Sequence, residues 1–231
     1  MKFKLLAAII PLVLLLPVSF ALDLTRPVCT IKELHYGMCF AKNMHQATIQ
    51  ERTSEFKSAF RAVVYQASKA LDKIPEPGPK KVLAVDLDET LVNNIGYYEK
   101  YGSNWQPETW TKWLLAPPKN RSKIYHRSVE FLIKKAKDKG LSVMFITGRP
   151  GNQALATFQQ TSTIPWDAGF LKPMGGVKIK SVVFKHDLRE LLKSYGYEVV
   201  MQIGDQESDF DVPVSRSEGE YLLPNLMYTI Y

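Results

Sequence analysis

Two carboxylates two positions apart follow a short apolar stretch of the chain. Asp86 and Asp88 come directly after residues Lys81–Val85, a run that is typical of a short buried strand. Carboxylates this close repel one another unless a cation sits between them. One of the two can attack a phosphorus atom while the other handles the proton of the leaving group. Because many loops contain an Asp-x-Asp pair, the pair alone indicates this chemistry only weakly.

Two further predicted strands end in polar groups that suit the same chemistry. Thr147 and Gly148 follow an apolar run and precede Pro150, so that a hydroxyl and free backbone N–H groups can cradle phosphate oxygens. A helix cap followed by a turn explains this pair equally well. Asp205 and Asp209 follow a third apolar run. The joint occurrence of these carboxylates, hydroxyl and backbone N–H groups at three strand ends predicts a site for metal-assisted phosphoryl transfer.

Phosphoryl transfer also requires a fixed positive group beside the transferred phosphoryl group. We predict that Lys185, at the head of a predicted helix, supplies this charge. Lys172, Lys178 and Lys180 are nearby alternatives, and a lysine chosen at random is more often a solvated surface residue.

Strand and helix patterns alternate along the chain from Lys81 onward. Short apolar strands separated by helices pair in parallel through crossovers. We therefore predict an α/β fold, a Rossmann-like three-layer sandwich with a parallel central sheet, whose ligand crevice lies at the carboxyl ends of the strands. Besides Lys81–Val85, the predicted strands are Leu141–Ile146 and Tyr197–Ile203, and the predicted helices are His126–Lys139, Gly151–Gln160 and Val182–Ser194.

Two segments lie outside this alternation. Apolar residues at helical spacing predict one long amphipathic helix over Met44–Leu71, within an N-terminal helical extension that spans residues 22–80. The segment 93–120 is rich in Tyr and Trp and predicts a small cap inserted after the first strand. Tyr97 and Trp105 in this cap are candidates for stacking on a nucleobase or an aryl leaving group. Packing of the cap onto the sheet is the alternative interpretation of these rings.

The first 21 residues have the pattern of a secretory signal peptide, with two lysines, an apolar run and a small-x-small site that predicts cleavage after Ala21. An uncleaved membrane anchor is the alternative. No other stretch approaches the roughly 18 apolar residues that span a bilayer, so we expect a secreted or periplasmic protein without a membrane anchor. In such an oxidising compartment Cys29 and Cys39 are expected to form a disulfide, with two buried thiols as the alternative.

Composition, charge and missing motifs limit the kinds of partner and of catalytic mechanism that the chain can have. The formal charge of +7 suits an anionic substrate, but the basic residues are not clustered enough to indicate a nucleic-acid polymer. The chain lacks an Arg-His-Gly-x-Arg stretch, and neither cysteine has an arginine six positions later, which excludes phosphohistidine and cysteinyl-phosphate mechanisms. Its 4 histidines are too few and too scattered for a dinuclear metal site.

The acidic motifs resemble those of a known family. Residues 85–91, Asn94, Tyr97 and the two Asp motifs at Gly204-Asp205 and Asp209-Phe210 are similar to the signatures of the haloacid dehalogenase-like phosphohydrolases. Within that superfamily they resemble the secreted acid phosphatase branch, with the bacterial class C enzymes and their four active-site aspartates, and also the plant vegetative storage proteins. The resemblance runs from about Lys81 to Phe210. It implies that residues 81–231 form the phosphatase domain.

The resemblance implies a role for each aspartate. Asp86 would attack phosphorus to form an aspartyl phosphate, and Asp88 would act first as general acid and then as general base. Mg²⁺ would be held by a carboxylate oxygen of Asp86, the backbone carbonyl of Asp88 and the carboxylate of Asp205, with Asp209 supporting these ligands from behind.

Residues on two other elements would bind the phosphoryl oxygens. Thr147, with Gly148, and Lys185 are the matching positions. The chain departs from the bacterial class C pattern in lacking the lipid-bearing cysteine, which argues against a membrane anchor.

These observations predict a secreted Mg²⁺-dependent acid phosphatase that hydrolyses small phosphomonoesters, with nucleotides among the candidates. Transfer of the phosphoryl group to another alcohol is one alternative, and an inactive storage or binding protein of the same fold is another. The sequence leaves the substrate, the pH optimum and the oligomeric state open, a homo-oligomer included.

Overall fold

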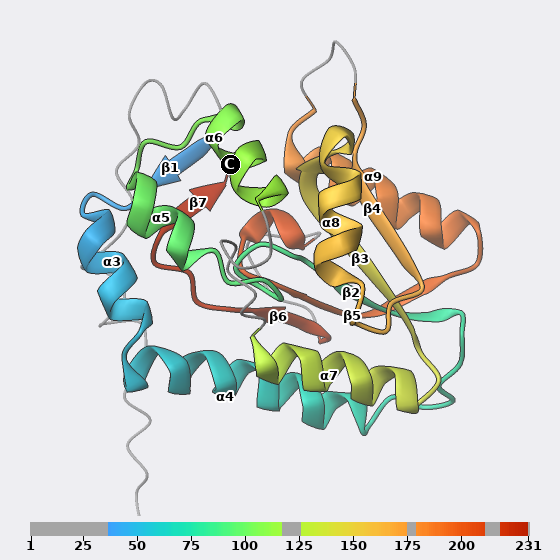
Figure 1. Ribbon diagram of the computed structural model, residues 1–231. Coiled ribbons are helices and arrows are strands. Elements are labelled where there is room, and N and C mark those ends of the chain that lie inside the picture. The colour runs from blue at the N-terminus through green and yellow to red at the C-terminus, as the bar shows by residue number, and fades with distance from the viewer. Residues whose placement is uncertain (1–36, 117–125, 175–178, 211–217, 231) are drawn as a thin grey trace, which may run out of the picture.

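The centre of the molecule is a five-stranded parallel sheet in the order β4-β3-β2-β5-β6 (Figure 1). The structure is a computed structural model that describes residues 37–116, 126–174, 179–210 and 218–230. All four strand pairs of this sheet are parallel, which confirms the predicted α/β fold with a parallel central sheet. Its strands are β2 (Lys81–Val85), β3 (Ser142–Pro150), β4 (Ala168–Lys172), β5 (Glu198–Gly204) and β6 (Glu220–Leu222).

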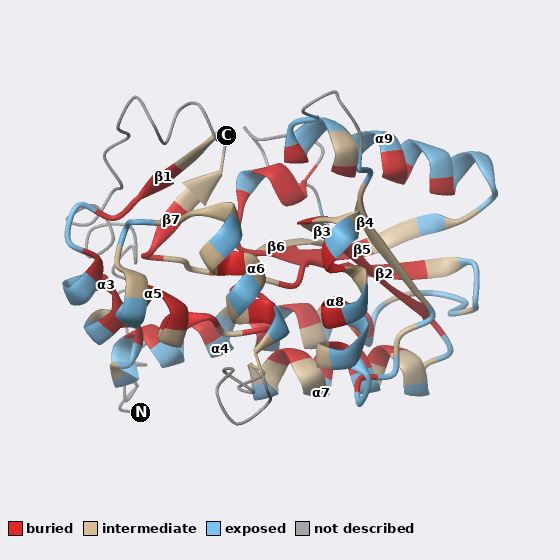
Figure 2. Cartoon of the chain, turned by 45° about the horizontal axis from the view of Figure 1, so that its top comes forward, coloured by how far each residue is buried: buried red, intermediate tan, exposed pale blue. Residues whose placement is uncertain are grey.

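Helices cover both faces of the sheet. On one face α4 (Ser54–Leu71) and α7 (Arg127–Asp138) lie side by side, and α9 (Ser181–Ser194) covers the other face (Figures 1 and 2). The strands serve both layers because successive side chains point to opposite faces. Leu83, Val85, Val143 and Phe145 belong to the core on the side of α4 and α7, whereas Val82, Ala84, Met144 and Ile146 pack with Leu188 and Leu192 of α9.

The N-terminal extension differs from the single long helix that its periodicity predicts. The structure has two helices there, α3 (Met44–Glu51) and α4, with a break at Arg52 and Thr53. The Thr53 backbone is extended, and its hydroxyl accepts the Phe56 N–H at 3.2 Å. A threonine whose oxygen caps the first turn starts a new helix, and this local contact interrupts an apolar pattern that continues through the break.

The segment after β2 contains two short helices, α5 (Ile95–Tyr101) and α6 (Pro107–Leu115). The ends of the other predicted helices differ from the structure by at most one or two residues. These helices are α7, the turn η3 (Gly151–Gln153) followed by α8 (Ala154–Thr161), and α9. The helix predicted over Gly151–Gln160 begins with a 3₁₀ turn. The domain boundaries, including the end of the cap at residue 120, remain predictions.

A second, two-stranded sheet joins the beginning and the end of the described chain. β1 (Met38–Phe40) pairs antiparallel with β7 (Tyr228–Ile230), at the same end of the molecule as α3 and α5 (Figure 1). Neither strand was predicted from the sequence, and β4 and β6 were not predicted either. Cys39 in β1 is fully buried and disulfide-bonded, while Cys29 and the predicted signal peptide lie outside the described residues.

Among the described residues, no helix combines the length and the apolar character needed to cross a membrane.

Glu51 is a buried acid at the end of α3. The residue is only 5% exposed, and its Oε1 accepts the backbone N–H of Leu226 at 2.8 Å. Burial raises the pKa of Glu51 from 4.5 to about 8, with the Leu226 hydrogen bond opposing the shift and the charge of Asp205 adding to it. The folded protein therefore holds this proton far more tightly than the unfolded chain does.

Glu51→Gln tests this consequence for stability. Protonated Glu51 contributes its full stabilisation below pH 4.5, and that contribution is lost as the pH rises to about 8. Glutamine keeps the acceptor for Leu226 and carries no charge, so the variant should gain stability over the wild type across this window. At about 1.4 kcal/mol per pKa unit, the gain should reach a few kcal/mol near pH 8. Urea unfolding at pH 5 and pH 8 measures it, and a gain that does not grow with pH would contradict the prediction.

Candidate active site

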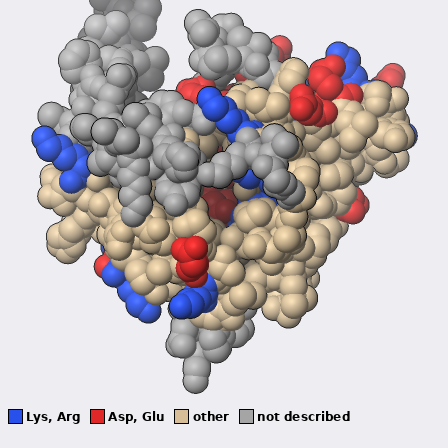
Figure 3. Space-filling view, turned by 90° about the horizontal axis from the view of Figure 1, so that it is seen from above, with Lys and Arg blue, Asp and Glu red and all other residues tan. Residues whose placement is uncertain are grey.

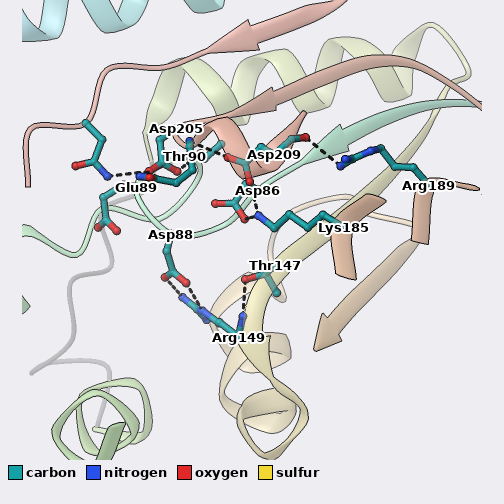
Figure 4. A network of polar contacts seen from close by, with 12 residues as sticks. Asp86, Asp88, Glu89, Thr90, Thr147, Arg149, Lys185, Arg189, Asp205 and Asp209 are labelled. Carbon is teal, nitrogen blue, oxygen red and sulfur yellow. Dashed lines mark hydrogen bonds and ion pairs between the residues drawn. The ribbon is translucent and has the colours of Figure 1, made fainter. Parts of the chain in front are cut away.

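The carboxyl ends of β2, β3 and β5 meet at one edge of the sheet and bring the predicted residues together (Figure 4). Asp86 follows β2 directly, Thr147 lies near the end of β3, and Asp205 follows β5. Lys185 reaches this edge from the first turns of α9, and Asp209 ends the 3₁₀ helix η4 (Glu207–Asp209). Seen from above this edge, acidic side chains lie recessed in a hollow with basic side chains beside them (Figure 3).

Lys185 contacts the predicted nucleophile directly. Its Nζ donates to Asp86 Oδ1 at 2.6 Å and also to Asp209 Oδ1, and all three residues are buried. Burial opposes the charge on Lys185, but the carboxylates of Asp209 and Asp86 outweigh it and hold the lysine pKa above its ordinary value. The ammonium group therefore stays charged beside Asp86.

The alternative lysines are placed differently. Lys172 is partly buried, and burial and the charge of Lys185 lower its pKa, but its Nζ faces the Ile179 carbonyl oxygen at 3.5 Å. Lys180 is exposed at the start of α9, and Lys178 lies outside the described residues. Among the described candidates, Lys185 is the one in contact with Asp86.

Three carboxylates form a cluster that can hold a metal ion. One oxygen each of Asp86, Asp205 and Asp209 lie within 4.8 Å of one another, and all three residues are buried. With Lys185 the cluster carries two net negative charges when all groups are ionised, which suits a divalent cation. Oxygen donors of this kind are those that Mg²⁺ prefers, so the donor set fits the ion that the sequence predicts.

The electrostatics of the cluster show why a cation would be favourable there. Burial and the neighbouring Asp209 raise the pKa of Asp205 to about 6, although hydrogen bonds from Asn225, Gln206 and Thr90 oppose the shift. Burial likewise raises the pKa of Asp86, with Lys185 opposing and the other two aspartates adding. Positive charge placed between these carboxylates would relieve this cost of ionisation.

Asp88 is held away from the cluster by an arginine. Arg149, itself only 2% exposed, donates from Nη2 to Asp88 Oδ1 at 2.6 Å and from Nε to Asp88 Oδ2 at 2.9 Å. The Asn94 side-chain amide donates to the same carboxylate at 2.9 Å. Arg149 is therefore a counter-charge of the Asp88 carboxylate, which was not foreseen from the sequence. Binding of Mg²⁺ by the backbone carbonyl of Asp88 remains a prediction.

The last residues of β3 place Gly148 beside the start of α9. The Thr147 hydroxyl oxygen accepts the Arg149 backbone N–H at 3.2 Å, which leaves its own proton available for an acceptor. A Cβ atom on Gly148 would lie 3.1 Å from the Ser181 hydroxyl oxygen, so this glycine lets the loop pack closely against the helix start. Figure 4 shows Thr147 on the side of Lys185 that faces Arg149, and phosphate binding by Thr147 and Gly148 remains a prediction.

The aromatic residues of the cap pack mainly on one another. Tyr97 is fully buried, its hydroxyl pairs with Thr109 at 2.8 Å, and its ring packs edge-on to Tyr98 and Trp110. This placement favours the packing alternative for Tyr97, whose contact with substrate remains a prediction. Trp105 is partly buried against the core, and its contact with substrate remains a prediction.

Glu89 holds the turn that follows the nucleophile, and the sequence analysis assigned it no role. Its φ of 57° lies in the left-handed region, and its N–H donates to the Val92 carbonyl at 2.7 Å. The side chain accepts the Asn94 N–H at 2.9 Å and the Tyr228 hydroxyl at 2.5 Å. A left-handed backbone costs a non-glycine residue energy. The side-chain contacts of Glu89 with the start of the cap and with the last strand stabilise this conformation, and they could not be predicted from the sequence.

The fold and this site define a haloacid dehalogenase-type phosphohydrolase architecture, and comparison with known proteins gives the family. Residues 36–231 match the family described as HAD superfamily, subfamily IIIB (acid phosphatase), and the chain belongs to this family. The resemblance inferred from the aspartate motifs is thereby confirmed.

Similar proteins include plant and bacterial members. Vegetative storage protein 1 of Arabidopsis thaliana is 30% identical over 157 residues, which cover 63% of this chain and 54% of that protein. Acid phosphatase 1 of Solanum lycopersicum is 27% identical over 161 residues, or 65% of this chain and 60% of that protein. The chain thus spans less than two thirds of the length of either relative.

A solved structure shares the fold. The class C acid phosphatase from Bacillus anthracis superposes with a TM-score of 0.64 at 19% identity, over 80% of this chain and 85% of that one.

Gly204→Ala tests the packing of the cluster. A Cβ atom at Gly204 would lie 2.1 Å from Asp209 Oδ2, so alanine must displace Asp209 from Lys185. Overpacking of this kind costs roughly 1–3 kcal/mol, which urea unfolding measures. Gly78→Ala is the matched control, because nothing lies within 4 Å of a Cβ there. Equal stability of the two variants would show that Asp209 is not held as described.

Proposed function

We propose that the chain is a Mg²⁺-dependent acid phosphatase that hydrolyses small phosphomonoesters through an aspartyl phosphate on Asp86. The observation that carries this proposal is the contact of Lys185 with Asp86 inside the buried cluster of three aspartates. The arrangement supplies a nucleophile, a fixed cation and a set of oxygen ligands within one hollow. We further propose that the protein acts outside the cytoplasm, as the predicted signal peptide implies.

Asp86 is the nucleophile in this mechanism. Its Oδ1 is held by Lys185, so the carboxylate has one orientation when a phosphate group enters the hollow. The positive charge of Lys185 and the hydroxyl of Thr147 would bind phosphoryl oxygens and favour the transition state, in which charge spreads over those oxygens. A divalent cation held by Asp86, the backbone carbonyl of Asp88 and Asp205, with Asp209 supporting these ligands, would supply further neutralisation of this charge.

Asp88 handles the proton. In the first step its carboxyl group donates a proton to the leaving oxygen, the bond between that oxygen and phosphorus breaks, and the phosphorus–Asp86 bond forms. In the second step Asp88 takes a proton from water, whose oxygen attacks phosphorus and releases Asp86 and inorganic phosphate. Arg149 and Asn94 fix the position of the Asp88 carboxyl group for both steps.

A storage protein of the same fold, with weak or no catalysis, is the rival proposal, because two relatives are named vegetative storage proteins. The presence of Asp86, its contact with Lys185 and the intact aspartate cluster favour an enzyme. A phosphotransferase would use the same residues and differ only in the alcohol that attacks the aspartyl phosphate.

Asp86→Asn should abolish hydrolysis of p-nitrophenyl phosphate, since an amide of the same shape is a poor nucleophile. Release of p-nitrophenolate is measured with Mg²⁺ and with EDTA from pH 4 to pH 8, and circular dichroism checks the fold. Asp72→Asn is the control, because Asp72 is an exposed partner of Lys135 remote from the site. Activity in the Asp86 variant, or none in the wild type with Mg²⁺, would refute the proposal.

Asp88→Asn separates the two chemical steps. With p-nitrophenyl phosphate the leaving group needs no proton, so the variant should release a burst of about one equivalent per protein and then stall at the hydrolysis step. With an alkyl phosphate such as glycerol 2-phosphate it should show no burst, and turnover should fall by roughly 10²–10⁴-fold. Rapid-quench kinetics measures both. Equal losses on the two substrates, without a burst, would exclude Asp88 as the proton donor.

A further inference from the structure

Asp205 is oriented by three side-chain donors in the described structure. Its Oδ1 accepts the Thr90 hydroxyl at 2.9 Å, and its Oδ2 accepts the Asn225 side-chain amide at 2.8 Å and that of Gln206. Thr90 lies in the same loop as Asp86, and Gln206 is the next residue in the chain. Asn225 comes from a different part of the molecule, the segment between β6 and β7.

The backbone decides which end of the Asn225 amide faces Asp205. Asn225 Oδ1 accepts the N–H groups of Met227 at 2.8 Å and Tyr228 at 3.3 Å. An amide oxygen occupied by two backbone donors leaves the NH₂ group on the opposite side. Asn225 therefore presents a hydrogen-bond donor to the carboxylate of Asp205 and cannot present an acceptor without losing both turn contacts.

The same segment is anchored by groups that are remote in sequence. The Leu226 N–H donates to Glu51 at 2.8 Å, and the Tyr228 hydroxyl donates to Glu89. Gln206 is also held from here, because its Oε1 accepts the Ile230 N–H at 2.9 Å. Both amides that contact Asp205 Oδ2 thus take their orientation from backbone groups of residues 227–230.

We infer that Asn225 is a positioning residue that orients the carboxylate of Asp205 toward the divalent cation, an inference that rests on the function proposed above. Together with Thr90 and Gln206, this donor holds the carboxyl group in one rotamer and leaves a lone pair for the cation. Without Asn225 two of the three donors remain, so the carboxylate is held less firmly and part of its ordering must accompany cation binding, at a cost in affinity. Loss of a partner that orients a metal ligand typically weakens metal binding 10–100-fold.

The experiment measures binding of Mg²⁺ alone to the full chain, without substrate. Mg²⁺ is titrated into wild type, Asn225→Ala and Asn225→Ser, and the rise in Tm is followed together with the heat of binding. The Mg²⁺ concentration that gives the half-maximal effect should be at least about tenfold higher in both variants than in the wild type. In activity assays the Mg²⁺ requirement should rise by a similar factor, while kcat at saturating Mg²⁺ falls much less.

The variants are chosen to separate positioning from folding. Serine can keep the turn, because its hydroxyl oxygen accepts backbone N–H groups weakly, but it lacks the amide donor that reaches Asp205. Asn43→Ala is the matched control, since Asn43 caps α3 by accepting the Gln46 N–H at 3.0 Å and is exposed. It should lose stability, by roughly 0.5–2 kcal/mol, and keep the Mg²⁺ affinity of the wild type.

The outcomes distinguish the two proposals. Wild-type Mg²⁺ affinity in both Asn225 variants overturns the positioning role and leaves the phosphatase proposal standing. If Asn43→Ala weakened Mg²⁺ affinity as much as the Asn225 variants do, the positioning role would also be overturned, because the loss of affinity would then follow general stability. Absence of any Mg²⁺ response in the wild type would overturn the metal site and, with it, this inference.

Discussion

Negative charge confined at one buried edge of the sheet is the constraint on which the rest of this structure depends. Asp86, Asp205 and Asp209 converge there, and a buried carboxylate without compensation costs several kcal/mol. Lys185 offsets part of this charge by contacting two of the three carboxylates. The remaining negative charge would attract a divalent cation. A cation bound there would lower the repulsion that a phosphoryl group otherwise meets.

The two carboxylates of the Asp-x-Asp pair have different basic partners, and this difference fits the different roles proposed for them. Lys185 is a compact ammonium group that leaves part of Asp86 open to the hollow. The planar guanidinium of Arg149 grips both oxygens of Asp88 and fixes the plane of its carboxyl group. Such a grip fixes the place of the Asp88 carboxyl group relative to Asp86. A nucleophile needs a free oxygen, which Lys185 allows.

The sequence predicted the fold and the centre of the site because both follow from local patterns. Apolar runs mark β2, β3 and β5, and parallel pairing then forces Asp86, Thr147 and Asp205 to one edge. Strands β1, β6 and β7 have three residues each, too short for a periodicity to register. The contacts of Arg149, Glu89 and Asn225 depend on partners 61, 139 and 20 positions away in the chain, and no local pattern encodes such pairs.

Several contacts that could not be predicted from the sequence share one physical task, which is to hold the loops of the candidate site in place. A loop at a sheet edge has few backbone partners of its own, so its geometry must come from neighbouring segments. Here the N-terminal extension supplies Glu51, and the chain near its end supplies Asn225 and Tyr228. These segments pack against one another through β1 and β7. The contacts that hold the aspartates thus involve both ends of the described chain, so the N-terminal extension belongs structurally to the candidate site.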